Sequence, residues 1–271
     1  MTRNRPTSQL ISVDYSRRVP FTIAHAAAVL PMHRLGRRIL PLTALMIGSM
    51  APDFGYFFSH EASRQLTHSL PSIISFSLPA GLVTWLFYIY VLEKATITLL
   101  SDRWHTRFAH TDAVTPALIG RACIAIVLGA ATHIVWDGFT HRGTFITNAI
   151  PALTGPTPGF SWLPIYHFLH GLSSVVGVGI LIHWARGLHR QPARSQIRPY
   201  RISERARVNA IRFLATSTVL VGFVHWVPFI HRRYDVQFFS AAVGSLSGFF
   251  IAWCFIGLGF WFHARRQRAK A

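Results

Sequence analysis

Several apolar runs, each close to the length needed to cross a bilayer, dominate the 271-residue chain. About 20 consecutive apolar residues are enough for a helix to span the hydrocarbon core. Only 13% of the residues are charged, against about 25% in a typical soluble domain. The sequence therefore predicts an all-α fold, a polytopic membrane helix bundle. We expect about six transmembrane helices, over 40–58, 70–92, 114–136, 164–185, 210–230 and 238–263.

The basic residues indicate how these helices are oriented. The formal net charge is +18, from 27 Lys and Arg against 9 Asp and Glu, and many of the arginines lie in loops between apolar runs. Residues 186–207 alone hold seven arginines and one acid. The positive-inside rule places this loop and both termini in the cytoplasm, with 59–69 and 138–163 outside. The excess charge also attracts anionic lipid, so membrane lipid is the expected partner, and no nucleic-acid motif is present.

The same pattern divides the chain into five parts. A polar, basic segment at 1–20 precedes a membrane domain at 21–185, which carries the candidate metal site. A basic cytoplasmic loop at 186–209 then leads to a transmembrane hairpin at 210–263 and a basic tail at 264–271. Nothing in the sequence indicates the oligomeric state.

The most informative motif closes the third apolar run, where His133, Asp137 and His141 are spaced four residues apart. On a helix each step of four turns the side chain by only about 40°, so the three share one face. Two imidazoles and a carboxylate on one face are typical of a divalent-metal site. The alternative is a helix end with three polar residues facing water. Gly138 and Gly143 weaken the helix there, so His141 is expected on the turn beyond it.

Further candidate ligands occur upstream. Asp53 follows Pro52 within an apolar run, where an unpaired carboxylate is costly, and His68 lies in a Thr-His-Ser sequence. The predicted topology brings both to the outer side with Asp137, and we expect Asp53, His133 and Asp137 to lie within ligand reach of one another. His25 is different, because it lies between two basic stretches. It joins the others only if residues 21–35 form a re-entrant or spanning segment, or if the whole topology is inverted.

Together the candidates exceed the three or four protein ligands of one zinc ion. They suit either two metals that share a carboxylate bridge or one metal with helper residues. Cys123 and Cys254 both lie inside apolar runs, so a thiolate site or a disulfide is not expected. Zinc, with manganese or iron as alternatives, is the expected cofactor. The candidate ligands are Asp53, His133, Asp137, His141, His68 and His25, of which His68 and His25 are also candidate catalytic proton-transfer groups. His167 and His170 could cover the site.

These motifs resemble a known family. The sequence contains Pro-Phe-Thr-x-x-His25, Gly-Ser-Met-x-Pro-Asp53-Phe-x-Tyr-Phe, Thr-His68-Ser-Leu, His133-x-x-x-Asp137-x-x-Thr-His141-x-Gly and Leu-Pro-x-Tyr166. In this order, from about Val19 to Gly177, they resemble a bacterial multi-pass membrane family catalogued as a domain of unknown function (4184 in that series). The resemblance implies a bacterial plasma membrane protein.

That family is similar in turn to membrane-bound metal-dependent hydrolases, whose motifs include P-D-x-D, H-R-G-x-T-H-S and H-x-x-x-D. Here Gly55 replaces the second aspartate of the first of these motifs, and Arg64-Gln65-Leu66 replaces His-Arg-Gly of the second. Both departures remove potential ligands, for which His141 could compensate.

Two functions follow from these observations. The first is a metal-dependent hydrolase that acts at the outer membrane face on a lipid or envelope ester. The second is a non-enzymatic membrane protein, a transporter or an assembly factor, in which the same residues form an ion pathway or a structural site. A continuous polar path to the cytoplasmic side would favour transport.

Overall fold

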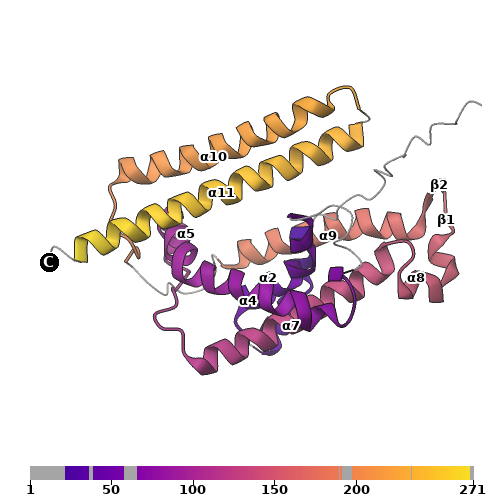
Figure 1. Cartoon of the computed structure of the whole chain (residues 1–271), viewed down its shortest axis with the longest axis horizontal. Coiled ribbons are helices and arrows are strands. Elements are labelled where there is room, and N and C mark those ends of the chain that lie inside the picture. Colours follow the sequence, from indigo (N-terminus) through magenta and orange to yellow (C-terminus); the bar gives the residue numbers. More distant parts are fainter. Residues whose placement is uncertain are drawn as a thin grey trace, which may run out of the picture.

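The computed structural model describes residues 22–36, 39–57, 66–188, 190, 197–232 and 234–268. Figure 1 shows a helical molecule in which two long helices, α10 and α11, lie side by side along one edge. A short β-hairpin and α8 lie at one end of the molecule, and the C-terminus lies at the other. Within the described residues this hairpin is the only sheet, so the predicted all-α membrane fold is confirmed.

The first half of the chain builds the body of the molecule from short and long helices. In order these are η1 (Thr22–Ala27), α1 (Leu30–Leu35), α2 (Leu42–Met50), η2 (Ala51–Phe57), η3 (Ile73–Ser77), α4 (Leu78–Phe87), η4 (Tyr88–Leu92), α5 (Glu93–Leu99), α6 (Asp102–His105) and α7 (Pro116–Thr140).

The second half continues from the end of α7. It comprises α8 (Phe145–Ala149), η5 (Pro151–Thr154), β1 (Pro156–Thr157), β2 (Phe160–Pro164), α9 (Ile165–Leu188), α10 (Glu204–Trp226), η6 (Val227–Phe229) and α11 (Tyr234–Arg268). The strands β1 and β2 are antiparallel.

Among the described residues, five helical stretches are long and apolar enough to cross a membrane: Ile73–Leu99, Pro116–Thr140, Ile165–Leu188, Glu204–Phe229 and Val236–Gln267. They cover five of the six expected spans. The sixth, 40–58, forms α2 and then the 3₁₀ helix η2. A nine-residue helix rises only about 14 Å, which is half of the hydrocarbon thickness.

Residues 22–57 instead enter and leave the bundle at the same end. His25 of η1 and Asp53 of η2 both lie beside His133, near the C-terminal end of α7. Between them, Met32 and Leu40 pack on the same apolar core as Leu118, near the N-terminal end of that helix. We call the described residues 22–36 and 39–57 the re-entrant hairpin, because His25 and Asp53, near its two ends, lie beside the same end of α7.

The apolar core fills the interior between the two ends of α7. Its buried members come from the re-entrant hairpin, the Ile73–Leu99 span and α7: Val29, Ala44, Leu45, Ile47, Trp85, Ile89, Ala122, Ala125 and Ile126. The indole N–H of Trp85 donates to Thr43 Oγ1 at 3.1 Å. This hydrogen bond satisfies the one polar atom of the largest side chain in the core.

The α10–α11 hairpin is joined to this body mainly through the Ile73–Leu99 span. The indole of Trp253 donates to Thr96 Oγ1 at 2.8 Å, and Gly257 lies against Val91 and Leu92. In the preceding loop, Arg198 binds the exposed Asp102 at 2.6 Å. This hydrogen bond from Arg198 lowers the pKa of Asp102 below its ordinary value.

Candidate metal centre

The last two turns of α7 supply the first half of the site. His133 and Asp137 project from one face, and their side chains are almost completely buried, with 0% and 2% of each residue exposed. The His133 Nε2 atom lies 3.6 Å from Asp137 Oδ2. The helix ends at Thr140, and His141 has an extended backbone conformation, as expected for a residue just beyond it. The alternative of polar residues facing water is therefore wrong for His133 and Asp137.

The re-entrant hairpin brings Asp53 to the same place because α2 approaches α7 unusually closely. A Cβ atom on Gly48 would lie 2.4 Å from the Ile126 carbonyl oxygen, and one on Gly129 would lie 2.4 Å from the Leu45 carbonyl oxygen. Only glycine permits this packing, because any larger side chain would overlap backbone atoms. The turn that follows α2 then directs the Asp53 Oδ1 atom to 3.5 Å from His133 Nε2.

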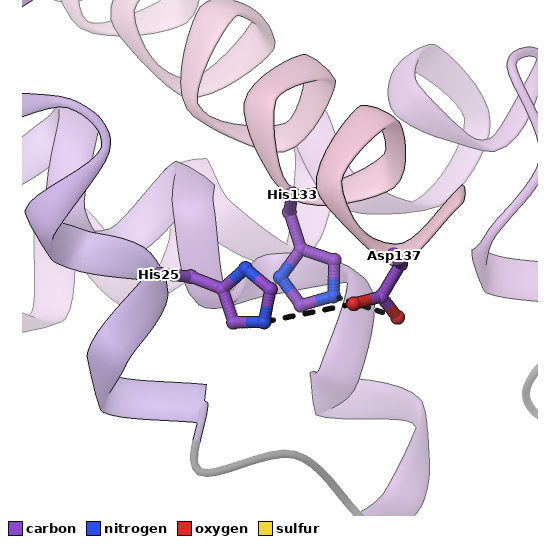
Figure 2. A group of neighbouring side chains, drawn as sticks. All are labelled: His25, His133 and Asp137. Atoms are coloured by element: carbon purple, nitrogen blue, oxygen red, sulfur yellow. Dashed lines mark ion pairs between the residues drawn. The ribbon is translucent and has the colours of Figure 1, made fainter. Parts of the chain in front are cut away.

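His25 also reaches the site, through η1. Its Nε2 atom lies 3.6 Å from Asp137 Oδ1, and Figure 2 shows its ring beside that of His133. The ring lies at this depth because η1 packs against α9 where Gly177 has no side chain. His25 therefore joins the other candidate ligands. Whether it does so through a re-entrant or spanning segment over 21–35 or through an inverted topology stays a prediction.

His68 completes a ring of four ligand atoms. Its Nε2 atom lies 3.1 Å from Asp53 Oδ1 and 3.6 Å from Asp137 Oδ2. The Thr67 hydroxyl lies 2.9 Å from His68 Nδ1, and this contact orients the imidazole. Pairing of both ring nitrogens fixes the direction in which His68 presents Nε2.

The outer edge of the site is formed by histidines that are less buried. His141 Nδ1 lies 3.4 Å from Asp137 Oδ2, and 16% of the side chain is exposed. The His141 ring packs edge-on against His170, with 5.1 Å between ring centroids, and His170 contacts His167 at 6.4 Å. These two α9 histidines therefore lie beside His141 at the edge of the site, and their covering role stays a prediction.

The distances between neighbouring atoms of the ring of four ligand atoms are those expected around one metal ion. Two overlapping triads, Asp53 with His68 and His133, and His25 with His133 and Asp137, each have their ligand atoms within 4.8 Å of one another. The separations given above for Asp53 Oδ1, His68 Nε2, His133 Nε2 and Asp137 Oδ2 run from 3.1 to 3.6 Å. Ligands about 2.1 Å from a tetrahedral ion lie about 3.4 Å apart. The predicted proximity of Asp53, His133 and Asp137 is thus confirmed, while their role as ligands stays a prediction.

The hydrogen bonding of His133 also favours a cation. Its Nδ1 atom lies 2.7 Å from the Ser49 carbonyl oxygen, which can only accept, so Nδ1 is protonated. The buried Nε2 atom makes no hydrogen bond to any described residue, yet it faces the carboxylates of Asp53 and Asp137. A lone pair facing two carboxylates in a buried site is unfavourable unless a metal ion or a proton lies between them.

The charged and neutral groups of the site also suit a cation. The carboxylates of Asp53 and Asp137 lie beside the imidazoles of His25, His68 and His133. Metals bind ionised carboxylates and neutral imidazoles, so both kinds of ligand are present in one place.

Two contributors to the site could not be identified from sequence motifs. The Ser49 carbonyl is a backbone atom, and its position depends on the packing of α2 against α7. Thr67 is of a residue type that is common at helix caps, so its identity alone does not mark it as part of the site. Its position directly before His68 is the one sequence feature that points to it. The two cysteines lie away from the site and are free.

Comparison with known proteins identifies the family. Neither a curated protein nor a solved structure matches the chain significantly. The sequence model of one family, described as Domain of unknown function (DUF4184), matches residues 19–258 and so includes all six residues of the site. The protein, a membrane-type helical bundle with a buried histidine and aspartate cluster that could hold a metal ion, belongs to this family.

Proposed function

We propose that the protein is a metal-dependent hydrolase of the bacterial plasma membrane, which acts at the outer face on a lipid or envelope ester. The observation that carries this proposal is the ring formed by Asp53, His68, His133 and Asp137, in which neighbouring ligand atoms lie 3.1 to 3.6 Å apart, close to the separation of two ligands of one tetrahedral ion. Two carboxylates balance the charge of such an ion. With nitrogen and oxygen donors in this arrangement, zinc is favoured over manganese and iron.

A bound divalent cation would supply two kinds of chemistry, by lowering the pKa of a water and by polarising the scissile group. The side chains of the protein would supply proton transfer and the exclusion of water. His141 lies beside Asp137 at the less buried edge of the site, where its imidazole can receive a proton from water or deliver one to a leaving group. The burial of Asp53 and His133 excludes bulk water from the ligand ring.

The surroundings of the site favour a membrane substrate. Val135 and Trp136, which lie between the two ligands on α7, are exposed on the outside of the helix bundle. Because this helix belongs to a membrane span, those side chains face lipid at the depth of the site. A lipid molecule in the same leaflet therefore lies within one helix diameter of the ligand ring.

The interior of the protein supports hydrolysis over transport. On the side of the site toward the N-terminal end of α7, the described residues form the continuous apolar core around Leu45, Trp85 and Ile126. An ion pathway requires polar groups or water along its length. The polar cluster thus ends against packed apolar side chains, and the lack of a polar path through this core within the described residues favours hydrolysis over transport.

Metal analysis of the detergent-purified protein tests this function. Protein prepared without chelator is expected to contain stoichiometric transition metal, and to hydrolyse p-nitrophenyl acetate or p-nitrophenyl phosphate in a chelator-sensitive manner that zinc restores. Elemental analysis and absorbance at the nitrophenolate band measure the two properties. Wild-type protein free of transition metal, and unable to take up added zinc, would contradict the proposal.

Labelling of introduced cysteines tests the orientation. The arginine-rich loop before α10 is proposed to be cytoplasmic, so the site and Thr22 lie at the outer end, and five crossings place the tail inside. The expectation of two cytoplasmic termini required a sixth crossing. In a background with Cys123 and Cys254 replaced by alanine, a membrane-impermeant maleimide is expected to label Ser8→Cys and Thr154→Cys in intact cells. It is not expected to label Ser195→Cys, and the reverse pattern would exclude this orientation.

A further inference from the structure

The rings of His25 and His133 are stacked, which limits what they can bind together. Their centroids are 3.9 Å apart and their planes differ by 21°. An ion bound to an imidazole nitrogen lies about 2.0–2.1 Å away, close to the plane of the ring, because the lone pair lies in that plane. Two stacked, nearly parallel planes have no common point so close to both nitrogens. One ion therefore cannot be bound well by both rings.

The carboxylate of Asp137 faces the two rings with different oxygen atoms. Its Oδ1 lies 3.6 Å from His25 Nε2, whereas its Oδ2 lies 3.6 Å from His133 Nε2. Figure 2 shows both rings on the same side of this carboxylate. A carboxylate that bridges two cations with its two oxygens is typical of two-metal sites, in which the ions lie about 3.5–4 Å apart. The ring centroids are 3.9 Å apart, so two ions bound in the planes of these rings would be separated by a distance of that order.

The two positions differ in how completely the chain encloses them. The position at Oδ2 is surrounded by His133, His68 and Asp53, so four protein ligands close it. The position at Oδ1 lies beside His25, whereas the partly exposed His141 lies 3.4 Å from Oδ2. A metal with few protein ligands keeps coordination positions for water or substrate, as catalytic sites do.

We propose that the centre holds two divalent cations bridged by Asp137. The first is bound by Asp53, His68, His133 and Asp137 Oδ2, and the second by His25 and Asp137 Oδ1. This inference rests on the proposed metal site and assigns His25 as a ligand of a second ion. It separates an ion with four protein ligands, which holds the re-entrant hairpin against α7, from an ion with fewer protein ligands, which keeps coordination positions for water or substrate.

Metal stoichiometry of the full-length protein in detergent tests the second ion. After removal of metal by chelator, titration with Mn²⁺ is followed by calorimetry and elemental analysis. Wild type is expected to bind two ions per chain, and His25→Ala one. The matched control is His183→Ala, which removes an exposed histidine of α9 away from the site and is expected to keep two ions.

Each outcome separates this inference from the proposed function. A wild type with one ion, or a His25→Ala protein that still binds two, overturns the second ion and leaves the first site intact. A wild type with none contradicts the proposed function as well. Should His25→Ala fail to fold, the wild type still decides the question. Two bridged Mn²⁺ ions give an exchange-coupled electron paramagnetic resonance spectrum, and a six-line spectrum of isolated Mn²⁺ at saturation overturns the proposal.

Discussion

Asp137→Asn is expected to abolish metal binding, with a loss of affinity well above 100-fold. The carboxylate is the one group that touches every imidazole of the site, at 3.4 to 3.6 Å from His25, His68, His133 and His141. An amide carries no charge and is a weak ligand, so both proposed positions lose their shared donor. Loss of an outer-shell partner typically costs only 10–100-fold, and the loss of this ligand is expected to exceed that range.

Calorimetric titration of chelator-treated protein with Zn²⁺ measures this effect. Asp102→Asn is the chemical control, since it makes the same substitution at an exposed residue that pairs with Arg198, and it is expected to bind zinc as the wild type does. In the alternative, the histidines and aspartates only pair with one another and hold no metal. Neither wild type nor Asp137→Asn then binds metal, and the two proteins differ only in stability. An Asp137→Asn protein with wild-type affinity would exclude Asp137 as a ligand.

Gly129→Ala is expected to destabilise the protein by about 3 kcal/mol or more, at the upper end of the usual cost of overpacking. The added methyl group would lie 2.4 Å from the Leu45 carbonyl oxygen and 2.6 Å from the Ser49 amide nitrogen. Both are backbone atoms, so α2 must move away from α7 as a unit. That movement also withdraws Asp53 and the Ser49 carbonyl from His133, so metal affinity falls together with stability.

Gly120→Ala supplies a matched control on the same helix. A Cβ atom at this position has nothing within 4 Å, and alanine is a better helix former than glycine by about 1 kcal/mol. Thermal unfolding in detergent, with zinc affinity measured in parallel, is expected to show a large loss for Gly129→Ala and no loss for Gly120→Ala. Equal melting temperatures for Gly129→Ala and wild type would show that α2 can shift at little cost.

The part of the site on α7 could be predicted because it depends on one regular helix. The spacing of His133 and Asp137 fixes their relative direction whatever the rest of the chain does. The participation of Asp53 in the site could be predicted for a different reason, because a carboxylate within a membrane-length apolar run needs a partner. These two signals do not depend on the number of spans, so the expected proximity of Asp53, His133 and Asp137 held although residues 42–57 form two short helices and not one long one.

The position of His25 could not be predicted because it depends on a re-entrant hairpin that has no periodic signal. Its helices are short, and the 3₁₀ helix η2 follows α2 without a polar break, so hydropathy merges them into one apparent span. Basic residues on both sides of His25 also led the charge rule to place it inside. The position of His25 in the site depends on the packing of Gly48 against Gly129 and of Ala24 against Gly177. Neither contact can be read from local sequence.

The anchor of His133 on a backbone oxygen changes which substitutions can affect it. Exchanging Ser49 for another small residue leaves the carbonyl in place, so the tautomer of the imidazole is insensitive to the side chain at its own contact point. The residue that matters more is Pro52, three positions after Ser49. In a 3₁₀ turn the backbone N–H of this position would donate to the Ser49 carbonyl and compete with His133. Proline has no such N–H. A residue with an N–H at position 52 would therefore compete with His133 for the Ser49 carbonyl, so replacing Pro52 is expected to perturb this ring more than exchanging the Ser49 side chain.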